Sequence, residues 1–598
     1  MCGIFGYLNF KGDGHSMLQR MAQQQIHRGP DSEGFFTDGA FGFGIRRLSI
    51  IDHVTGDQPI HNEDKTVWVV CNGEIYNYIE LRAQLKKKGH VFQTKSDVEC
   101  IVHLYEEYGI QAIEKLNGMY GLALYDKKLK KLFVVRDRLG IKPLYYSYEN
   151  GILLFSSELR SIIATGLVDT TFDWNAISYF LDQLYIPTPF SPFASIKKLN
   201  PGRILEVTCG RSPLIEVKTY WDINTIPNDA AGQSENDATE NLTSLLNDSS
   251  RIQLRADVPI CIFLSGGIDS SAVTAFASMH VSNPLRTFHV YFDGATQKLD
   301  ERKHARMVAQ RYGTEHSEVK VDRNDFKKLI PRLLWHLEEP FGDLAAVPTF
   351  IISEMARKDA TVCLNGSGGD ELFAGYPHHD QQFSVKRSVA GALERIRVAD
   401  QVRMAFGRYV RPWKKLFPEY RDIRHRQQPE DKGKTFPGDI RNRLMARDID
   451  GYLQSNVLFL LDKIAMAVSL EGRVPLLDHR FVEVAAHLPS QMKVKNGQSK
   501  HIFKKVLEPY LPGEVLHKQK EGFGAPLVDW LDAETIGILQ NVVKNGRLKR
   551  EKMLCLPEND INKLTGWDLW KVACLDLWSN IVAQPCECPR NNTLMDYM

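Results

Sequence analysis

Short apolar runs separated by glycine-containing turns fill the first third of the chain. Five of them have the length and alternation of strands: Gly39–Ile45, Val67–Cys71, Gly121–Tyr125, Leu132–Arg136 and Ile152–Ser156. Two other stretches, Ile79–Lys88 and Val98–Tyr108, space their apolar residues as an amphipathic helix does. The pattern predicts sheets with a few helices packed on their faces.

The pattern changes after the polar segment Ile226–Asn241, where we place a domain junction. Beyond it, helical stretches alternate with the short apolar runs Val258–Leu264, Leu285–Tyr291 and Ala360–Leu364. Because strands alternate with helices there, we expect a parallel sheet built of strand–helix–strand units.

Charge excludes one class of function. The segment Lys386–Lys434 is rich in arginine and lysine, and we expect a charged helical surface with a solvated loop at Arg424–Lys434. The whole chain is nevertheless close to neutral, with 75 Lys and Arg against 73 Asp and Glu. This balance argues against a nucleic-acid partner held by bulk charge.

The length of the chain and the kinds of segment that it lacks narrow the class of protein further. The 598 residues, 43% of them hydrophobic, suffice for two to four globular domains. No apolar run approaches the ~20 residues that span a bilayer. The N-terminus lacks the basic and apolar regions of a signal peptide, and the ten cysteines are scattered. We therefore expect a cytoplasmic protein with free thiols and no membrane partner.

Cys2 is the first residue with distinctive chemistry. A small side chain at position two permits removal of the initiator methionine, which leaves a cysteine with a free α-amine. The pKa of such an amine is about 7.7–8.0, so part of it is unprotonated at neutral pH. The amine lies within reach of its own thiol, which makes one residue both nucleophile and base.

Groups that suit a glutamine follow within the next hundred residues. Arg47 can bind a carboxylate, and Asp97, just ahead of a predicted helix, can bind an ammonium group. The Asn72 amide beside the Gly73 N–H forms a natural pair of oxyanion donors for acyl transfer. With a thiol to attack an amide, the set fits glutamine as substrate.

These segments carry a family resemblance. MCGIFG, HRGPD, RRLSI, NGEIYN and KSDVE, in this order, resemble the glutaminase domain of class II glutamine amidotransferases, which are N-terminal-nucleophile hydrolases. The resemblance implies an αββα sandwich, with Cys2 as nucleophile and its α-amine as base. It also implies an oxyanion hole at Asn72 and Gly73. The implied glutamine-binding residues are Arg47, Asn72, Glu74 and Asp97.

A second group of motifs begins where the run Val258–Leu264 ends. The sequence SGGIDSS (265–271) follows, and a helical pattern comes next. A strand, a glycine turn and a helix N-terminus form a phosphate cradle, because backbone N–H groups and the helix dipole face the anion. The serines add hydroxyl donors, and Asp269 can hold the magnesium that accompanies a nucleotide.

SGGIDSS is similar to the pyrophosphate loop of enzymes that cleave ATP between the α- and β-phosphates and form an acyl-adenylate. LNGSGGDELFAGY (364–376), SLEGRVPLLD (469–478) and KQKEGF (518–523) come later in the chain. In this order the motifs resemble the synthetase domain of asparagine synthetases, which implies a parallel-sheet α/β ATP-pyrophosphatase domain.

Site residues follow from this second resemblance. Asp269 and Asp370 would hold Mg²⁺, and Lys520 would stabilise negative charge on the adenylate or the tetrahedral intermediate. For Arg473 and Lys500, structural and catalytic roles both stay open. The implied ATP-binding residues are Leu264, Ser265, Gly267, Asp269, Ser270, Val290 and Gly366.

Two departures leave the acceptor open. Most asparagine synthetases carry an acid after Asn365-Gly366, but this chain has Ser367. Either a neighbouring acid such as Glu371 takes its role, or synthesis is slow, or the acceptor chemistry differs. The segment Glu338–Pro348 resembles the bacterial branch of the family, members of which also amidate carboxylates other than aspartate.

We therefore expect a two-domain glutamine-dependent amidotransferase that forms a homodimer. The expected parts are a glutaminase domain (1–210), a linker (211–240), a synthetase-like domain (241–545) and a helical extension with a tail (546–598). Its substrates would be glutamine, Mg-ATP and a carboxylate, with aspartate favoured, and ammonia would pass between the sites inside the protein.

Three alternatives remain at this stage. The acceptor could be another carboxylate, such as cell-wall diaminopimelate or a natural-product acid. Ser367 could impair the synthetase site and leave a glutaminase or a regulatory protein. A cyclase of the β-lactam synthetase kind is disfavoured by the intact Cys2, since those relatives generally lose the nucleophile.

Overall fold

The computed structural model describes residues 2–210, 212–226, 232–292, 300–379, 416–417, 438–518, 530–564, 566–583 and 588–597. The basic segment Lys386–Lys434, apart from residues 416–417, and its expected loop Arg424–Lys434 lie outside the described residues. Lys520 lies outside them as well.

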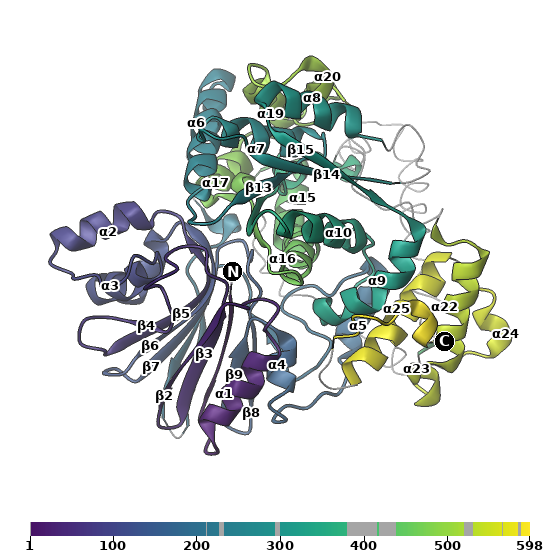
Figure 1. Cartoon of the computed structure of the whole chain (residues 1–598), viewed down its shortest axis with the longest axis horizontal. Helices are drawn as coiled ribbons and strands as arrows, with labels where there is room; N and C mark the ends of the chain where they lie inside the picture. The colour runs from purple at the N-terminus through teal and green to yellow at the C-terminus, as the bar shows by residue number, and fades with distance from the viewer. Residues whose placement is uncertain are drawn as a thin grey trace.

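Two six-stranded antiparallel sheets form the N-terminal part (Figure 1). The first, in the order β10-β8-β9-β1-β3-β2, comprises β1 (Gly3–Leu8), β2 (Ser32–Asp38), β3 (Phe41–Arg47), β8 (Tyr145–Glu149), β9 (Ile152–Ser156) and β10 (Lys197–Lys198). The second, in the order β12-β11-β7-β6-β5-β4, comprises β4 (Ile60–His61), β5 (Val67–Ile75), β6 (Gly118–Asp126), β7 (Lys131–Arg136), β11 (Arg203–Thr208) and β12 (Leu214–Thr219).

Helices cover the outer face of each sheet. α1 (Gly14–Gln23) and α4 (Leu159–Ile163) pack on the first sheet, and α2 (Tyr78–Lys87) and α3 (Glu99–Tyr108) pack on the side of the second. Apolar side chains from both sheets meet between them in one buried cluster. The predicted αββα sandwich is therefore confirmed. A short helix, α5 (Trp174–Gln183), follows the sandwich helices in the chain.

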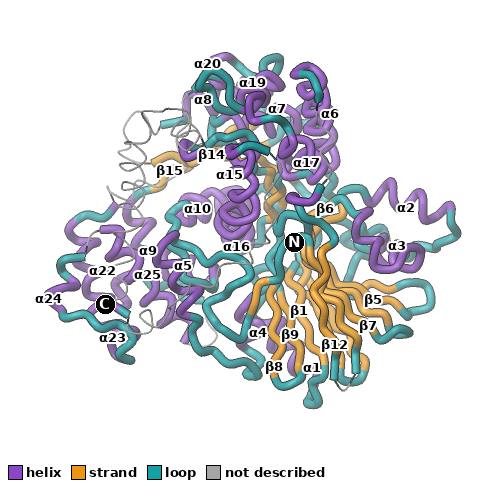
Figure 2. Tube along the Cα trace, turned by 180° about the vertical axis from the view of Figure 1, so that it is seen from behind, coloured by secondary structure: helices purple, strands orange, loops and turns teal. Residues whose placement is uncertain are grey.

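A five-stranded parallel sheet, in the order β15-β14-β13-β16-β17, organises the C-terminal part, as predicted. Its strands are β13 (Ile260–Phe263), β14 (Arg286–Phe292), β15 (Glu315–Val321), β16 (Val362–Leu364) and β17 (Glu471–Arg473). Figure 2 shows from behind that most of this part is helical, whereas the antiparallel strands gather in the N-terminal part.

The helices of the C-terminal part begin with α6 (Glu235–Gln253), so the predicted junction is partly helical. A capping box between Ser234 and Asp237 starts α6. The helices that follow up to β17 are α7 (Ile268–Ser278), α8 (Arg302–Tyr312), α9 (Arg323–Leu337), α10 (Ala346–Arg357), α11 (Gly369–Leu372), α15 (Ile440–Asp448) and α16 (Leu458–Met466). Those after β17 are α17 (His479–His487), α18 (Ser490–Lys493), α19 (His501–Leu507), α20 (Gly513–Leu516), α22 (Ala533–Asn545), α23 (Arg547–Arg550), α24 (Glu558–Ile561) and α25 (Gly566–Ala583).

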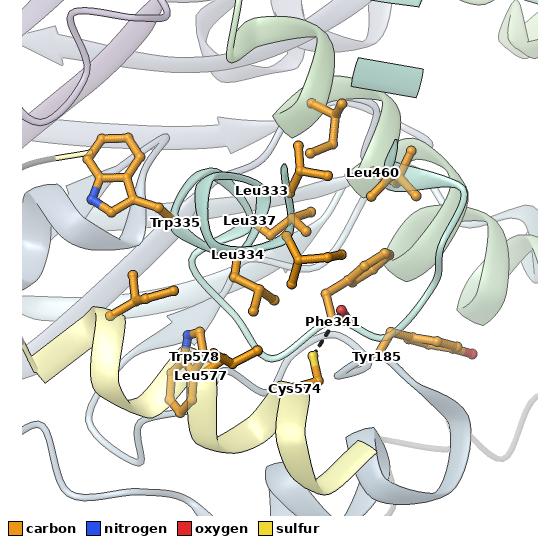
Figure 3. Close-up of a cluster of buried hydrophobic side chains, with 14 of the residues drawn as sticks. Tyr185, Leu333, Leu334, Trp335, Leu337, Phe341, Leu460, Cys574, Leu577 and Trp578 are labelled. Carbon is orange, nitrogen blue, oxygen red and sulfur yellow. Dashed lines mark hydrogen bonds between the residues drawn. The ribbon is translucent and has the colours of Figure 1, made fainter. Parts of the chain in front are cut away.

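Side chains of the C-terminal helix α25 bond to backbone carbonyls of the segment that follows α9. Trp578 Nε1 donates to the Glu338 carbonyl at 2.9 Å, and Trp570 Nε1 donates to the Gly342 carbonyl at 2.9 Å. Cys574 Sγ lies 3.3 Å from the Phe341 carbonyl, and apolar side chains of α9 and α25 meet around this contact (Figure 3). The expected helical extension thus packs against the synthetase-like part.

Buried ion pairs join the two parts of the molecule. Arg28 Nη1 lies 2.8 Å from both Glu158 and Asp462, and Lys463 Nζ lies 2.9 Å from Glu158 and 2.5 Å from Glu338. Each of these side chains is at most 2% exposed. Arg28 and Glu158 belong to the N-terminal part and the other three to the C-terminal part, so each part neutralises charges of the other.

Two sequence expectations concern the surroundings of the chain. No described helix has both the length and the apolar character that a membrane crossing requires. The cysteines among the described residues all have free thiols.

We predict that Lys463→Met lowers the free energy of unfolding by about 3–5 kcal/mol, because it leaves two buried carboxylates without their shared cation. Urea unfolding followed by circular dichroism measures the change. The matched control is Lys303→Met, which removes an exposed pair with Glu514 and should leave the unfolding curve unchanged. Equal curves for Lys463→Met and Lys303→Met would contradict the stabilising role of the buried network.

Candidate active sites

Cys2 lies directly before β1, between the two antiparallel sheets. Its backbone nitrogen, which becomes the α-amine once Met1 is removed, lies 3.1 Å from Asn72 Oδ1. Arg28 Nε donates to the Cys2 carbonyl at 3.0 Å, so the residue is held from both sides. Burial raises the pKa of the Cys2 thiol, and the nearby Arg47 guanidinium opposes that effect.

The predicted oxyanion donors lie on β5. Asn72 is fully buried, and its Nδ2 atom lies 3.3 Å from Ser157 Oγ. Gly73 has φ +148°, and a Cβ there would lie 1.9 Å from the Met119 carbonyl oxygen. Only glycine fits this position, which keeps the backbone beside Asn72 open to a ligand.

Arg47 ends β3, and backbone groups fix its guanidinium. Nη2 donates to the carbonyls of Ile51 and Asp52 at 3.1 and 2.6 Å, and Nη1 lies 2.9 Å from Asp57. The chain folds a tight loop around this side chain, so its orientation is set before any ligand arrives.

Two buried acids face the same region. Asp97 accepts a hydrogen bond from the Ile75 N–H at 2.7 Å, and burial raises the pKa of its carboxyl to about 6. Burial also raises the pKa of Glu74 well above its usual value, and the neighbouring Glu471 adds to the rise. The structure thus brings together the predicted Cys2, Asn72, Gly73, Glu74 and Asp97, with Arg47 close enough to act on the thiol.

Arg473 joins this group from the other part of the molecule. It ends β17, is fully buried, and places Nη2 3.6 Å from Glu74 and Nε 2.6 Å from Glu471. The carbonyl of Arg473 accepts a hydrogen bond from the Asn365 N–H at 2.8 Å, and Asn365 lines a second pocket. Sequence reasoning left the role of Arg473 open, because nothing in the pattern brings β17 to β5.

The second pocket is a cavity of about 550 Å³ at the carboxyl ends of β13, β14 and β16, the edge where α/β sheets bind ligands. Every predicted ATP-binding residue lines it: Leu264, Ser265, Gly267, Asp269, Ser270, Val290 and Gly366.

The loop before α7 has the form of a phosphate cradle. Gly266 has φ +80°, and a Cβ there would lie 2.8 Å from two backbone atoms of the loop and start of α8. Ser265 Oγ accepts from the Gly267 N–H at 3.2 Å and lies 2.9 Å from Ser270 Oγ. A Cβ on Gly366 would lie 2.5 Å from the Ser270 nitrogen, so the two glycine loops pack directly on each other.

The predicted metal ligands Asp269 and Asp370 converge on one cation. Lys500 Nζ lies 2.7 and 2.6 Å from the two Asp269 oxygens and 2.7 Å from Asp370. Carboxylate oxygens are the ligands that Mg²⁺ prefers, and two of them around one point suit a nucleotide-bound ion. Lys500 therefore belongs to this site, whereas Lys520 lies outside the described residues.

Ser367, the departure from the family pattern, also lines the cavity, and its hydroxyl and N–H both bond to Asn365 Oδ1, at 2.6 and 2.8 Å. Glu371 lines the same cavity and accepts a hydrogen bond from the Tyr376 hydroxyl at 2.7 Å. Burial raises the pKa of Glu371 to about 7, and the hydrogen bond from Tyr376 opposes the rise. An acid that titrates near neutrality is thus present in the pocket.

The fold and the two sites define a glutamine amidotransferase joined to an ATP-dependent ligase. A family model described as a glutamine amidotransferase domain matches residues 1–221, and one described as asparagine synthase matches residues 241–579. The chain belongs to the asparagine synthase family, as the resemblance predicted, and is an amidotransferase of the glutamine-hydrolysing asparagine synthetase type.

Curated relatives match over most of their length. Asparagine synthetase [glutamine-hydrolyzing] 1 of Bacillus subtilis is 33% identical, with 97% of each chain covered. A putative asparagine synthetase [glutamine-hydrolyzing] of Mycobacterium tuberculosis is 32% identical, with 89% of each chain covered. The amidase chry2 of Gibberella zeae is 28% identical, covering 89% of this chain and 90% of its own.

We predict that glutamine binding weakens as the pH falls through about 6, the pKa of Asp97. Above that pH the carboxylate can pair with the ammonium group of glutamine, and below it the protonated acid cannot. Arg473 lowers the pKa of both Asp97 and Glu74, so Arg473→Met should move this acid limb to higher pH. Calorimetric titration of glutamine into a Cys2→Ala variant, which cannot turn over, measures the affinity at each pH.

The matched control is Arg480→Met, because Arg480 pairs with Asp478 and Asp248 rather than with Glu74. Arg480→Met should not shift the pH dependence of glutamine affinity. An affinity that stays flat from pH 5 to pH 8, or an Arg473→Met profile that overlies the parent profile, would refute the assignment.

Proposed function

We propose that this chain makes asparagine from aspartate, with glutamine as nitrogen donor and with ATP converted to AMP and pyrophosphate. The observation that carries the proposal is the pairing, in one chain, of a buried N-terminal cysteine beside an oxyanion pair with a cradle-lined cavity holding two carboxylates. The names of the curated relatives support aspartate as the acceptor.

In the first site, Cys2 Sγ would attack the amide carbon of glutamine. The contact between the Cys2 nitrogen and Asn72 Oδ1 would hold the α-amine in place to accept the thiol proton and pass it to the departing ammonia. The Asn72 amide and the Gly73 N–H would bind the oxyanion. Water would then hydrolyse the thioester and release glutamate.

In the second site, a carboxylate oxygen of the acceptor would attack the α-phosphorus of ATP, and pyrophosphate would leave. Ammonia would attack the acyl carbon, and AMP would leave. The backbone of the 265–271 loop and its serine hydroxyls would bind the phosphates. Asp269 and Asp370 would hold Mg²⁺, which neutralises phosphate charge, and Lys500 lies close enough to orient both carboxylates.

The cavity carries groups of both signs for a zwitterionic acceptor. Asp343 and Glu371 line it as acids, and Lys500, Lys504 and Lys518 line it as cations. An amino acid such as aspartate needs a cation for its α-carboxylate and an acid for its ammonium group. Residues Arg47, Glu74 and Asp97 provide the corresponding set for glutamine in the first site.

Glu371 would supply the acid that Ser367 does not. It lies in the same cavity, and its pKa of about 7 suits a group that takes a proton from the attacking ammonia near neutral pH. The hydrogen bond from Tyr376 would orient the carboxyl. The predicted homodimer remains part of this proposal and can be measured by sedimentation.

The defining experiment supplies glutamine, Mg-ATP and aspartate and follows glutamate, pyrophosphate and asparagine together. We expect asparagine and pyrophosphate in equal amounts. Cys2→Ala should abolish glutamate formation and leave synthesis from ammonium salts intact, because its second site is unchanged. Glutamate without asparagine or pyrophosphate would exclude aspartate as acceptor, and the same assay with diaminopimelate would then test another carboxylate.

Glu371→Gln should lower asparagine synthesis by about 10²-fold, the usual contribution of a positioned acid–base group, and leave glutamine hydrolysis unchanged. Ser367→Glu introduced into that variant should restore part of the lost rate. The matched control is Glu354→Gln, which changes a side chain that is 55% exposed and should have no effect. Full synthetic activity in Glu371→Gln would rule out this role.

A further inference from the structure

A cluster of two histidines and two glutamates lies on the α2–α3 side of the N-terminal domain, at the edge of the molecule (Figure 1). Glu63 follows β4, His90 follows α2, and His103 and Glu106 lie one turn apart on α3. One ligand atom from each of the four lies within 4.8 Å of all the others. None of these residues belongs to either site described above.

The distances inside the cluster lie at the long end of the hydrogen-bond range or just beyond it. His90 Nδ1 lies 3.3 Å from Glu63 Oε1 and 3.7 Å from Glu106 Oε2. His103 Nδ1 lies 3.3 Å from Glu63 Oε2 and 3.3 Å from Glu106 Oε2. Two nitrogens and two carboxylates therefore surround one point, each histidine facing both acids.

Three of these four distances, at 3.3 Å, match the separation of neighbouring ligands in a tetrahedral zinc site. With Zn–N and Zn–O distances of about 2.0–2.1 Å, neighbouring ligand atoms of a tetrahedron lie about 3.3 Å apart. A second cluster in the described residues shows the contrast, since His378 and His379 both lie 2.7 Å from a single oxygen of Asp448. That is hydrogen-bond spacing on one acceptor, and it leaves no room for an ion between the groups.

Outer carboxylates lie beside the Nε2 atoms of both histidines, at hydrogen-bond distance for His90 alone. The Nε2 atom of His90 lies 3.2 Å from Glu107 Oε1, and the Nε2 atom of His103 lies 3.6 Å from Glu99 Oε1. Each imidazole therefore turns Nδ1 inward and Nε2 toward an acid, the arrangement found around metal-bound histidines. Glu99 is itself held by the N–H groups of Gln93 and Thr94, at 2.6 and 2.8 Å.

The acids of the cluster are positioned in the same way. Glu106 Oε1 accepts from Asn62 Nδ2 at 2.8 Å, which leaves Oε2 facing the histidines. Glu63 Oε1 accepts from the Val91 N–H at 2.9 Å. His103 is 1% exposed and Glu63 36% exposed, so the cluster has a buried base and an open side through which an ion can enter.

We propose that Glu63, His90, His103 and Glu106 bind one structural Zn²⁺ ion. Imidazole nitrogens and carboxylates suit Zn²⁺, and four protein ligands leave no open position for catalysis. The ion would tie the turn after β4 and the end of α2 to α3. Because α3 begins two residues after Asp97, it would also stiffen that end of the glutamine site.

Zinc titration of the full chain tests the proposal. The parent for every variant is Cys2→Ala, treated with chelator and then freed of it, so that the active-site thiol does not compete for metal. We expect one equivalent of Zn²⁺ to bind in competition with a chromogenic chelator, and the melting temperature to rise with added zinc. Co²⁺ in the same site should give the intense visible absorption of tetrahedral coordination.

His90→Gln and His103→Gln should each weaken zinc binding more than about 100-fold and remove the zinc-dependent rise in melting temperature. The matched control is His15→Gln, an exposed histidine of α1, which should bind like the parent. Glutamine hydrolysis by His90→Gln with an intact Cys2 checks that the variant folds. Absence of saturable binding, or equal affinity in the two cluster variants and the control, would overturn the proposal.

Discussion

The two halves of this enzyme depend on charges that neither half can bury alone. Arg28 and Glu158 of the sandwich domain share ion pairs with Asp462 and Lys463 of the parallel-sheet domain, all nearly inaccessible to water. An isolated ion in such surroundings costs several kcal/mol, so removing one partner is far more harmful than an exposed pair would suggest. The docked arrangement of the domains is therefore a requirement for the stability of each.

Two further buried lysines extend this network of ion pairs, each beside an acid. Lys142 Nζ lies 3.5 Å from Asp462, and Lys198 Nζ lies 2.7 Å from Glu339, next to Glu338. Burial alone would raise the pKa of Glu158, but the charges of Lys463 and Arg28 hold it below its usual value. Burial and the charge of Glu158 raise the pKa of Glu338 to about 7. The pKa values of two acids in contact with one lysine thus shift in opposite directions. The interface between the two parts is therefore polar, and each of its buried cations faces an acid.

Local patterns allowed most of the fold to be predicted, and they picked out candidate residues that the structure brings together, because each motif lies within one strand–loop segment. β13, which ends at Phe263, and the glycines after Leu264 form the cradle within one continuous segment. Arg473 is different: β17 pairs with β16, and this long-range pairing brings the guanidinium to Glu74. The pairing of Glu158 with Lys463 likewise depends on domain docking, which no periodicity encodes. The sequence alone showed that Ser367 departs from the family pattern. It could not show the burial that raises the pKa of Glu371.

Arg473 and Lys500 have the same electrostatic role in the two sites, since each is a cation that pairs with two acids. Glu471 and Asp97 raise the pKa of Glu74, Glu471 also raises the pKa of Asp97, and Arg473 is the cation that opposes these effects. Asp269 and Asp370 meet at Lys500 in the same way. In each case a protein cation lies among buried or half-buried acids and offsets part of their charge before the substrate or metal cation arrives. Because β16–β17 pairing carries Arg473 beside Asn365, the backbone that sets charge in the glutamine site also borders the nucleotide cavity. A shift of β17 relative to β16 would therefore change the electrostatics of one site and the shape of the other together.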